Sequence, residues 1–100
     1  MEIEFTWDRA KAKRNLQKHG VSFETAKRVF SDPHLIVVED CEIEGEIRYH
    51  AIGYAASQRL LTVVFVDRAQ EDREIPHIIS ARKAEAYEQS TYSDQFTQGD

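Results

Sequence analysis

The chain of 100 residues has the length of one domain, and its 41% hydrophobic and 31% charged residues are typical of a folded globular protein. The longest apolar run, Leu60–Val66, is far too short for a membrane-spanning helix, and the N-terminus lacks the pattern of a signal peptide. A single cysteine, Cys41, excludes an intrachain disulfide and suggests a reducing compartment. We therefore expect one cytoplasmic domain over residues 1–93, with a frayed tail at 94–100 and no membrane partner.

The net charge of −5 is unevenly distributed along the chain. Residues 1–30 contain seven Lys or Arg and four acids, a local charge of +3, whereas residues 31–80 contain four and ten, a local charge of −6. A basic N-terminal region in an acidic protein is compatible with a phosphate-binding patch, although charge alone favours ordinary solvated faces. Nucleic acid therefore stays among the candidate partners.

Local signals predict a strand followed by two helices in the N-terminal third. Residues 3–7 alternate between apolar and polar side chains, which is typical of a short half-buried strand. Asp8 is a good N-cap, and Gly20 is a natural left-handed stop, so the first helix should lie between them. Ser22 can cap a second helix over 23–31, which ends at an Asp-Pro pair.

The first predicted helix has two distinct faces. Three cations share one face: Lys11, Arg14 and Lys18. Ala12, Leu16 and His19 form a neighbouring stripe, which we expect to face the core. The cationic face is the first candidate for contact with phosphates.

The rest of the chain predicts a sheet and a closing helix. We expect strands over residues 34–39, 47–55, 60–66 and 74–80, with an acidic loop over 40–46. Gly53 indicates a bulge or a close approach of another backbone segment. Ser80 is a candidate N-cap for a helix to about Tyr92, with Ala84, Tyr87 and Thr91 as its apolar stripe. Two helices, an antiparallel four-stranded sheet, optionally extended by the short N-terminal strand, and a last helix make an α+β domain.

The side chains able to do chemistry are cations and histidines near the ends of these elements. The four histidines form no close-spaced ligand pair, so no metal site is expected, and P-loop, dinucleotide and nucleophile-elbow motifs are missing from the sequence. Arginines can balance the charge that develops on a phosphate during RNA cleavage, and His or Lys can transfer the protons. Surface ion pairs and a core-edge histidine are the alternative interpretations.

Four separate motifs resemble the BrnT family of type II toxins. They are Trp7-Asp8-x-x-Lys11-x-x-x-Asn15-x-x-Lys18-His19-Gly20-Val21-Ser22-Phe23, Arg48-x-x-x-Ile52-Gly53, Leu60–Val66 with Arg68, and Ile78-Ile79-Ser80-Ala81-Arg82-Lys83-Ala84. They occur in the family's order and cover about residues 3–88. The resemblance implies a RelE-like fold and a metal-independent bacterial endoribonuclease, without cofactor, that inhibits translation and growth.

The same resemblance implies partners and site residues. A small antitoxin encoded beside the toxin would neutralise it, RNA would be the substrate, and operator DNA would be bound only through the antitoxin complex. The implied catalytic residues are His19, Arg48, Arg68 and Arg82. RNA binding would fall to Lys11, Arg14, Lys18 and Lys83. His77 occupies a position where many members have arginine, and it is a candidate proton carrier.

A second hypothesis is a degenerate toxin that no longer cleaves RNA but still binds an antitoxin and contributes to operon repression. A third is direct nucleic-acid binding by the basic helix. Cleavage of RNA by the isolated chain distinguishes the first hypothesis from the others.

Overall fold

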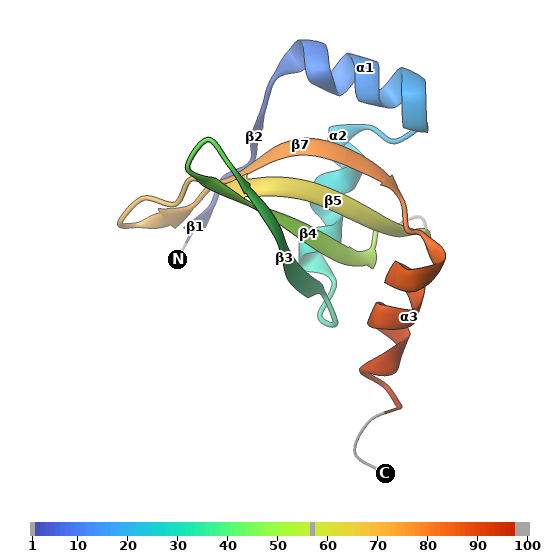
Figure 1. Ribbon diagram of the computed structural model, residues 1–100. Coiled ribbons are helices and arrows are strands. Elements are labelled where there is room, and N and C mark those ends of the chain that lie inside the picture. The colour runs from blue at the N-terminus through green and yellow to red at the C-terminus, as the bar shows by residue number, and fades with distance from the viewer. Residues whose placement is uncertain (1, 57, 98–100) are drawn as a thin grey trace.

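The computed structural model describes residues 2–56 and 58–97 and shows three helical segments around a curved sheet (Figure 1). The elements in chain order are β1 (Glu2–Ile3), β2 (Thr6–Trp7), α1 (Arg9–His19), α2 (Phe23–Ala26), the 3₁₀ helix η1 (Lys27–Ser31), β3 (Ile36–Ile43), β4 (Glu46–Tyr54), β5 (Leu60–Asp67), β6 (Arg73–Glu74), β7 (Pro76–Lys83) and α3 (Ala86–Asp94). The fold is α+β, as expected from the sequence.

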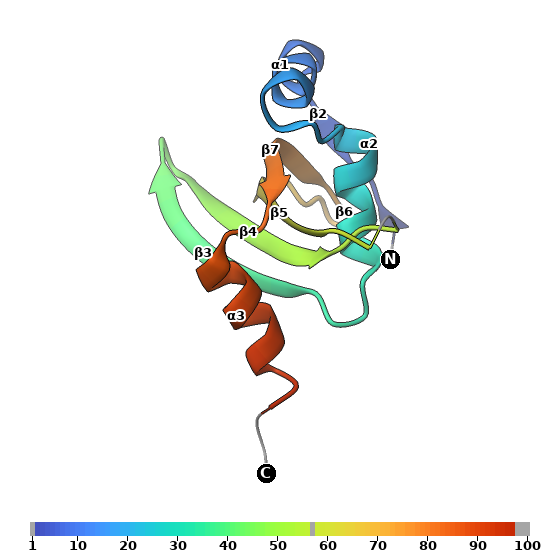
Figure 2. The same ribbon diagram turned by 90° about the vertical axis from the view of Figure 1, so that its right-hand side faces the viewer.

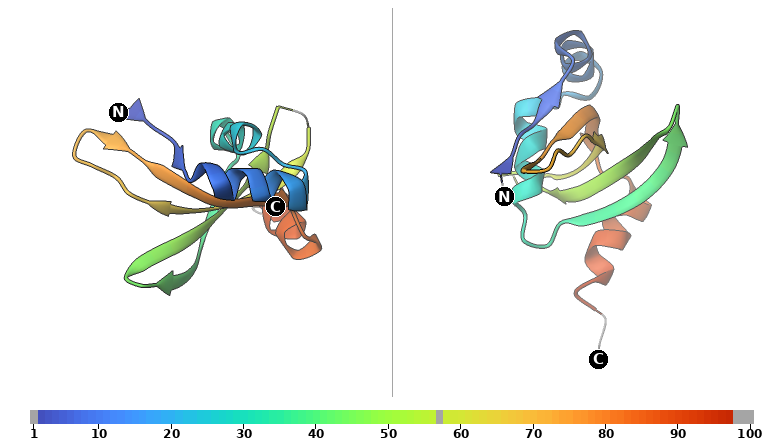
Figure 3. Two further views of the ribbon diagram at one scale, coloured as in Figure 1. Left: turned by 90° about the horizontal axis from the view of Figure 1, so that it is seen from above. Right: turned by 90° about the vertical axis from the view of Figure 1, so that its left-hand side faces the viewer.

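The central sheet has five strands in the order β2-β7-β5-β4-β3. β3, β4, β5 and β7 pair antiparallel with their neighbours, whereas the short β2 pairs parallel with β7. The optional N-terminal strand is therefore present, and it makes the sheet mixed rather than antiparallel throughout. β1 pairs parallel with β6 beside the loop that precedes β7, and this small pair projects from one end of the molecule (Figure 3).

Helix α1 has the ends predicted from the sequence but a different buried face. Asp8 Oδ1 accepts a hydrogen bond from the Lys11 N–H at 2.9 Å, and Gly20 ends the helix with φ +71°. Leu16 was expected to face the core, but its exposed fraction is 49%. The residue of α1 that is buried is Asn15, because its amide bonds to the backbone of β7.

The second helical segment covers one face of the sheet (Figure 2). Ser22 caps it as expected, by accepting a hydrogen bond from the Thr25 N–H, but only α2 is α-helical and the chain tightens into η1. Gly53 of β4 lies directly beneath: an added Cβ would come within 3.0 Å of Val29 Cγ1. The close approach at Gly53 is thus made by the side chains of Val29 and Asp32 rather than by another backbone segment. The core on this face consists of Val21, Phe23, Ala26, Val29, Ala51, Ala55, Leu61, Val63, Phe65, Ile78 and Ala81.

The acidic segment over 40–46, expected as a loop, is mostly strand. β3 continues to Ile43, and only Glu44 and Gly45 form the turn, with φ of +50° and +82°. Two consecutive residues with positive φ are the geometry of a tight two-residue hairpin, which lets the strands continue to the turn. Because β3 extends this far, Asp40 lies on a strand next to β4.

The last helix begins later than expected. β7 runs through Arg82 and Lys83, which pair in register with Thr62 and Leu61 of β5, so neither cation lies in the first turn of a helix. Glu85 is the N-cap of α3, in a capping box with Glu88.

The buried face of α3 also differs from the expected apolar stripe. Glu88 and Tyr92 are its buried residues, whereas Tyr87 is 62% exposed. After the helix, Gln95 donates a hydrogen bond to the His34 carbonyl at 2.9 Å, and Phe96 packs against the ring of His34. Gln95 and Phe96 of the expected tail make these contacts, so this part of it is packed rather than frayed, and 98–100 lie outside the described residues.

Candidate active site

The sheet face opposite α2 and η1 carries a row of polar side chains. Strand alternation and register bring Arg48 and His50 of β4 to this face, with Arg82 of β7 on the far side of β5. Helix α3 lies over one end of this face and leaves the remainder of the curved sheet uncovered (Figure 2). The polar row therefore meets the first turns of α3.

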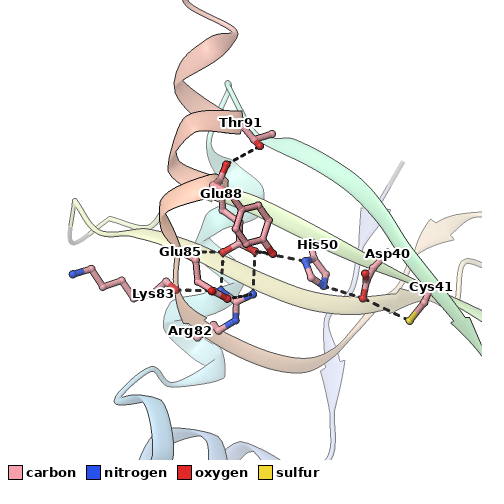
Figure 4. A network of polar contacts seen from close by, with 9 residues as sticks. Asp40, Cys41, His50, Arg82, Lys83, Glu85, Glu88 and Thr91 are labelled. Atoms are coloured by element: carbon pink, nitrogen blue, oxygen red, sulfur yellow. Dashed lines mark hydrogen bonds and ion pairs between the residues drawn. The ribbon is translucent and has the colours of Figure 1, made fainter.

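Arg82 and Glu88 form a bidentate ion pair where β7 meets α3 (Figure 4). Arg82 Nη1 donates to Glu88 Oε1 at 2.7 Å, and Nη2 donates to Oε2 at 3.0 Å. The Glu88 side chain is 1% exposed, and Oε1 also accepts the Glu85 backbone N–H at 2.8 Å. The guanidinium plane is consequently fixed by two parallel bonds to an immobile carboxylate.

The local electrostatics keep both partners charged. Burial by itself would raise the pKa of the Glu88 carboxyl, but hydrogen bonds from Arg82 and from the Glu85 backbone outweigh it and lower the pKa to about 2. The hydrogen bond to Glu88 raises the pKa of Arg82 further above its usual value. A permanent cation therefore stands at the end of β7.

His50 lies between two carboxylates that come from different elements (Figure 4). Its Nδ1 is 3.7 Å from Glu88 Oε2, and its Nε2 is 3.4 Å from Asp40 Oδ2. Asp40 reaches this position because the β3–β4 register shifts between Glu39 and Cys41, which is a β-bulge. Bulges re-aim side chains and are frequent next to active sites.

Arg48 and Arg68 have different surroundings. Arg48 makes no ion pair within residues 2–56 and 58–97, and its buried Nε has no hydrogen-bond partner there. Arg68 is exposed and pairs with Glu46, with Nε 3.2 Å from Oε2. Of these two arginines, Arg48 is therefore the one whose charge is not already balanced by a close carboxylate.

His77 lies on β7 near the other end of the strand. Its Nδ1 is 2.8 Å from the Thr6 hydroxyl of the neighbouring strand β2. Burial, followed by the positive charge of Arg68, lowers the pKa of His77 below the usual histidine value. His77 is thus favoured in its neutral form, which can accept a proton.

The cations of α1 line a separate groove along β7. Its lining residues are Lys11, Arg14, Asn15, Lys18, His19, Ile79 and Ser80. The groove has a volume of about 410 Å³ and is widely open to solvent. Ser80 belongs to both regions, since it lines the groove and lies two residues before Arg82 on the same strand.

The part of the chain that the structure describes lacks two kinds of site. It contains no group of three or more His, Cys, Asp or Glu side chains able to hold a metal ion. None of its helices has the length and apolar character needed to cross a bilayer. Cys41 is exposed, and burial and the charge of Asp40 raise the pKa of its thiol.

Comparison with known proteins decides the family. Residues 7–88 match the family described as the ribonuclease toxin, BrnT, of type II toxin–antitoxin systems. The chain belongs to the BrnT family. Its structure is similar to a crystal structure of the ribonuclease toxin BrnT from Brucella abortus, with a TM-score of 0.62, 24% identity, and coverage of 85% of this chain and 99% of that one. At this identity the likeness is one of fold. Comparison with curated proteins gives no match.

Set on the BrnT fold, the residues predicted from the sequence fall into three groups. Arg48 and Arg82 lie on the polar sheet face, together with His50. Lys11, Arg14, Lys18 and His19 line the α1 groove. Arg68 pairs with Glu46 in the hairpin region, His77 contacts β2, and Lys83 is exposed at the end of β7. No described contact joins His19 or Arg68 to the Arg82 pair.

Sequence reasoning did not single out Glu88 and Asp40, the two carboxylates that contact His50 in this BrnT chain. Glu88 has the pattern of a solvated helix residue, and Asp40 belongs to an acidic run expected as a loop. Strand alternation places His50 correctly on the face of Arg48 but does not single it out as a candidate. A weak signal exists for Glu88, because it stands three residues after Glu85 in a capping-box spacing.

Proposed function

We propose that the protein is a metal-independent endoribonuclease toxin with a RelE-like fold, and that its active site is the sheet face around Arg82. The toxin cuts cellular RNA, thereby inhibits translation and growth, and is neutralised by a cognate antitoxin. Operator DNA is contacted only through the antitoxin complex. The observation that carries the proposal is the guanidinium of Arg82, held by a buried carboxylate beside His50 and on the face of Arg48.

The chemistry of RNA cleavage fits this set of groups. The 2′-hydroxyl attacks the adjacent phosphorus, so charge develops on the phosphoryl oxygens while one proton is lost and another is gained. Fixed guanidinium groups stabilise that charge without reorganising, and Arg48 and Arg82 are placed to do so. His50 supplies a proton-transfer group between them, and His77 stays a candidate proton carrier further along β7.

The α1 groove supports binding of the RNA strand on either side of the scissile phosphate. Lys11, Arg14 and Lys18 present three positive charges along a surface that continues through Ser80 toward Arg82. Backbone phosphates bind such cations without regard to base sequence, which raises affinity and the association rate. His19 lines the same groove, so we assign it to binding rather than to the catalytic role expected from the sequence, and the exposed Lys83 at the end of β7 stays a candidate for binding.

The experiment is cleavage of a defined RNA by the purified chain in the presence of EDTA. We expect 2′,3′-cyclic phosphate ends, no requirement for added metal, and loss of at least about 100-fold in rate for Arg82→Lys, which keeps a charge but not the bidentate fork. Lys27→Gln, an exposed change on η1, is the matched control. An intact RNA after prolonged incubation contradicts the proposal.

A degenerate, non-catalytic toxin is the second candidate function. It is favoured by one observation: Glu88 and Glu46 already pair with Arg82 and Arg68, which balances two of the predicted cations. Under this alternative the chain binds its antitoxin and shifts operator DNA with it, but RNA stays intact at any enzyme concentration. The same cleavage assay therefore separates the two functions.

A further inference from the structure

Glu88 accepts more hydrogen bonds than an anchor for Arg82 needs. Oε1 accepts hydrogen bonds from Arg82 and from the Glu85 backbone, and Oε2 accepts one from Arg82 and one from the Tyr87 hydroxyl at 3.3 Å. Oε2 also faces Nδ1 of His50. A carboxylate held by four donors cannot turn away from the imidazole, so the side of His50 that it faces is fixed.

The two nitrogens of His50 consequently have unequal surroundings. Nδ1 faces a carboxylate that is 1% exposed, whereas Nε2 faces Asp40, whose side chain is 50% exposed. A carboxylate repels a nitrogen lone pair and attracts an N–H, so the rigid Glu88 favours the proton on Nδ1, whereas Asp40 favours it on Nε2 from a half-exposed side chain that can turn to solvent. Asp40 can move away from Nε2, whereas Glu88 cannot move away from Nδ1.

We propose that Glu88 is the positioning residue of the active site: it holds His50 by Nδ1, so that Nε2 is the nitrogen that exchanges a proton with the RNA 2′-hydroxyl. This inference rests on the proposed ribonuclease function. Asp40, carried to Nε2 by the β-bulge, occupies the place of the substrate in the free protein. An arriving phosphate repels its carboxylate, and the exposed side chain turns toward solvent.

In the proposed cleavage step, His50 accepts one proton and water supplies another. The 2′-hydroxyl proton passes to Nε2 as the O2′–P bond forms and the P–O5′ bond breaks. The leaving 5′ oxygen takes a proton from water, and His50 later returns its extra proton to solvent. Arg82 and Arg48 face the phosphoryl oxygens, and Nδ1 keeps its proton throughout.

The charged groups around His50 come from four elements of the described chain. Glu88 comes from α3, Arg82 from β7 and Asp40 from β3, while Arg48 precedes it on the same face of β4. Glu88 keeps Oε2 toward Nδ1 while it pairs with Arg82, and Asp40 is the second anion, 3.4 Å from Nε2. The two carboxylates therefore favour opposite tautomers, and the buried Glu88 is the one that cannot move away.

The purely structural alternative is that Glu88 only joins α3 to β7 through Arg82. Under that alternative the imidazole takes the tautomer with the proton on Nε2, which predominates in water. The test must therefore read the imidazole itself and not only activity or stability.

The experiment uses the full chain labelled with ¹⁵N at histidine, with the His50 nitrogen shifts read by two-dimensional NMR at a pH where the ring is neutral. We expect the Nδ1–H tautomer in the wild type and a shift toward Nε2–H in Glu88→Gln. Glu85→Gln is the matched control: it removes an acid whose Oε1 is 3.4 Å from Arg82 but which has no contact with His50. Its tautomer should equal that of the wild type.

Cleavage assays complete the test. We expect His50→Gln to lose about 100-fold or more in rate and Glu88→Gln at least about tenfold, with the pH profile flattened in the first variant. An Nε2–H tautomer in the wild type overturns the inference even if Glu88→Gln fails to fold. Full activity of His50→Gln in a chain whose wild type cleaves RNA also overturns it. Failure of the wild type to cleave contradicts the proposed function, whereas the tautomer still tests Glu88.

Discussion

The phenol of Tyr92 donates a hydrogen bond of 2.7 Å to Oδ2 of Asp32, sixty residues earlier in the chain. The same oxygen accepts the Tyr54 backbone N–H at 2.8 Å, and Oδ1 accepts that of His34. Asp32 thus joins the end of η1, the end of β4 and the helix α3. Since α3 supplies Glu88, the Asp32 carboxylate helps to hold the helix that carries one member of the proposed active site.

Tyr92→Phe tests that connection. The variant should lose about 1–2 kcal/mol of unfolding free energy at neutral pH, because one hydrogen bond to a charged group disappears from a nearly buried position. Burial and the Asp32 carboxylate raise the pKa of Tyr92 to about 12. The stabilising effect is therefore complete below pH 10 and is lost as the pH rises toward 12. Urea titrations at about pH 7 and about pH 11.5 should show the difference between the two proteins shrinking.

Glu88 predicts a stability change at acid pH. Its pKa of about 2 in the folded chain lies below that of an unfolded glutamate, so its stabilising effect is present above pH 4.5 and is lost as the pH falls toward 2. The difference of about 2.5 between the two pKa values corresponds to roughly 3 kcal/mol. Unfolding free energies at about pH 6 and about pH 2.5 check this. Because other carboxylates also titrate, the comparison is with Glu88→Gln, whose acid loss should be smaller by that amount.

Gly53→Ala tests the packing of η1 on β4. The new methyl group would meet Val29 Cγ1 at 3.0 Å and Asp32 Oδ2 at 3.2 Å, so these packed side chains must shift by a few tenths of an ångström. We expect a loss of about 1–3 kcal/mol in unfolding free energy. Gly45→Asn is the control, since that position is open and asparagine tolerates its φ of +82°. Equal stabilities of the two variants would contradict the close packing.

The α1 groove predicts salt-dependent RNA binding. Replacing Lys11, Arg14 and Lys18 with glutamine should weaken binding of a non-cleavable 2′-deoxy oligonucleotide. The slope of log K against log salt should become shallower by about 2, since each single-strand phosphate that a cation no longer neutralises accounts for about 0.7. Fluorescence anisotropy at several salt concentrations measures this slope. Lys13→Gln, on an exposed position of the same helix, should leave it nearly unchanged.

The sequence predicted the parts of the fold that local chemistry determines. Asp8, Gly20 and Ser22 act within three or four residues of their own positions, so the helix ends that they cap could be predicted from the sequence. The start of α3 could not be predicted in this way. Arg82 and Lys83 have side chains suited to a helix, but pairing with β5 holds them in a strand, and that pairing is a long-range effect.

Some residues of the candidate site could likewise be predicted from local sequence, and others could not. Arg48 and Arg82 stand in motifs of the chain, and strand alternation places His50 beside Arg48. Glu88 and Asp40 reach the site through a helix that packs on the sheet and through a bulge in β3. Neither event has a local signal strong enough to identify which of many acidic residues is buried or re-aimed. The two carboxylates could therefore be identified only from the three-dimensional structure.

Asn15 of α1 bonds to the edge of β7 that faces away from β5, beyond the end of the short strand β2. Its amide nitrogen donates to the Ala81 carbonyl at 2.8 Å, and its Oδ1 accepts the Ala81 N–H at 3.1 Å. The groove of α1 is thereby locked to the residue just before Arg82. The backbone of α1 is therefore held at a fixed distance from that of β7. In the proposed ribonuclease, the groove would bind the RNA backbone a set number of phosphates away from Arg82, without reading the bases.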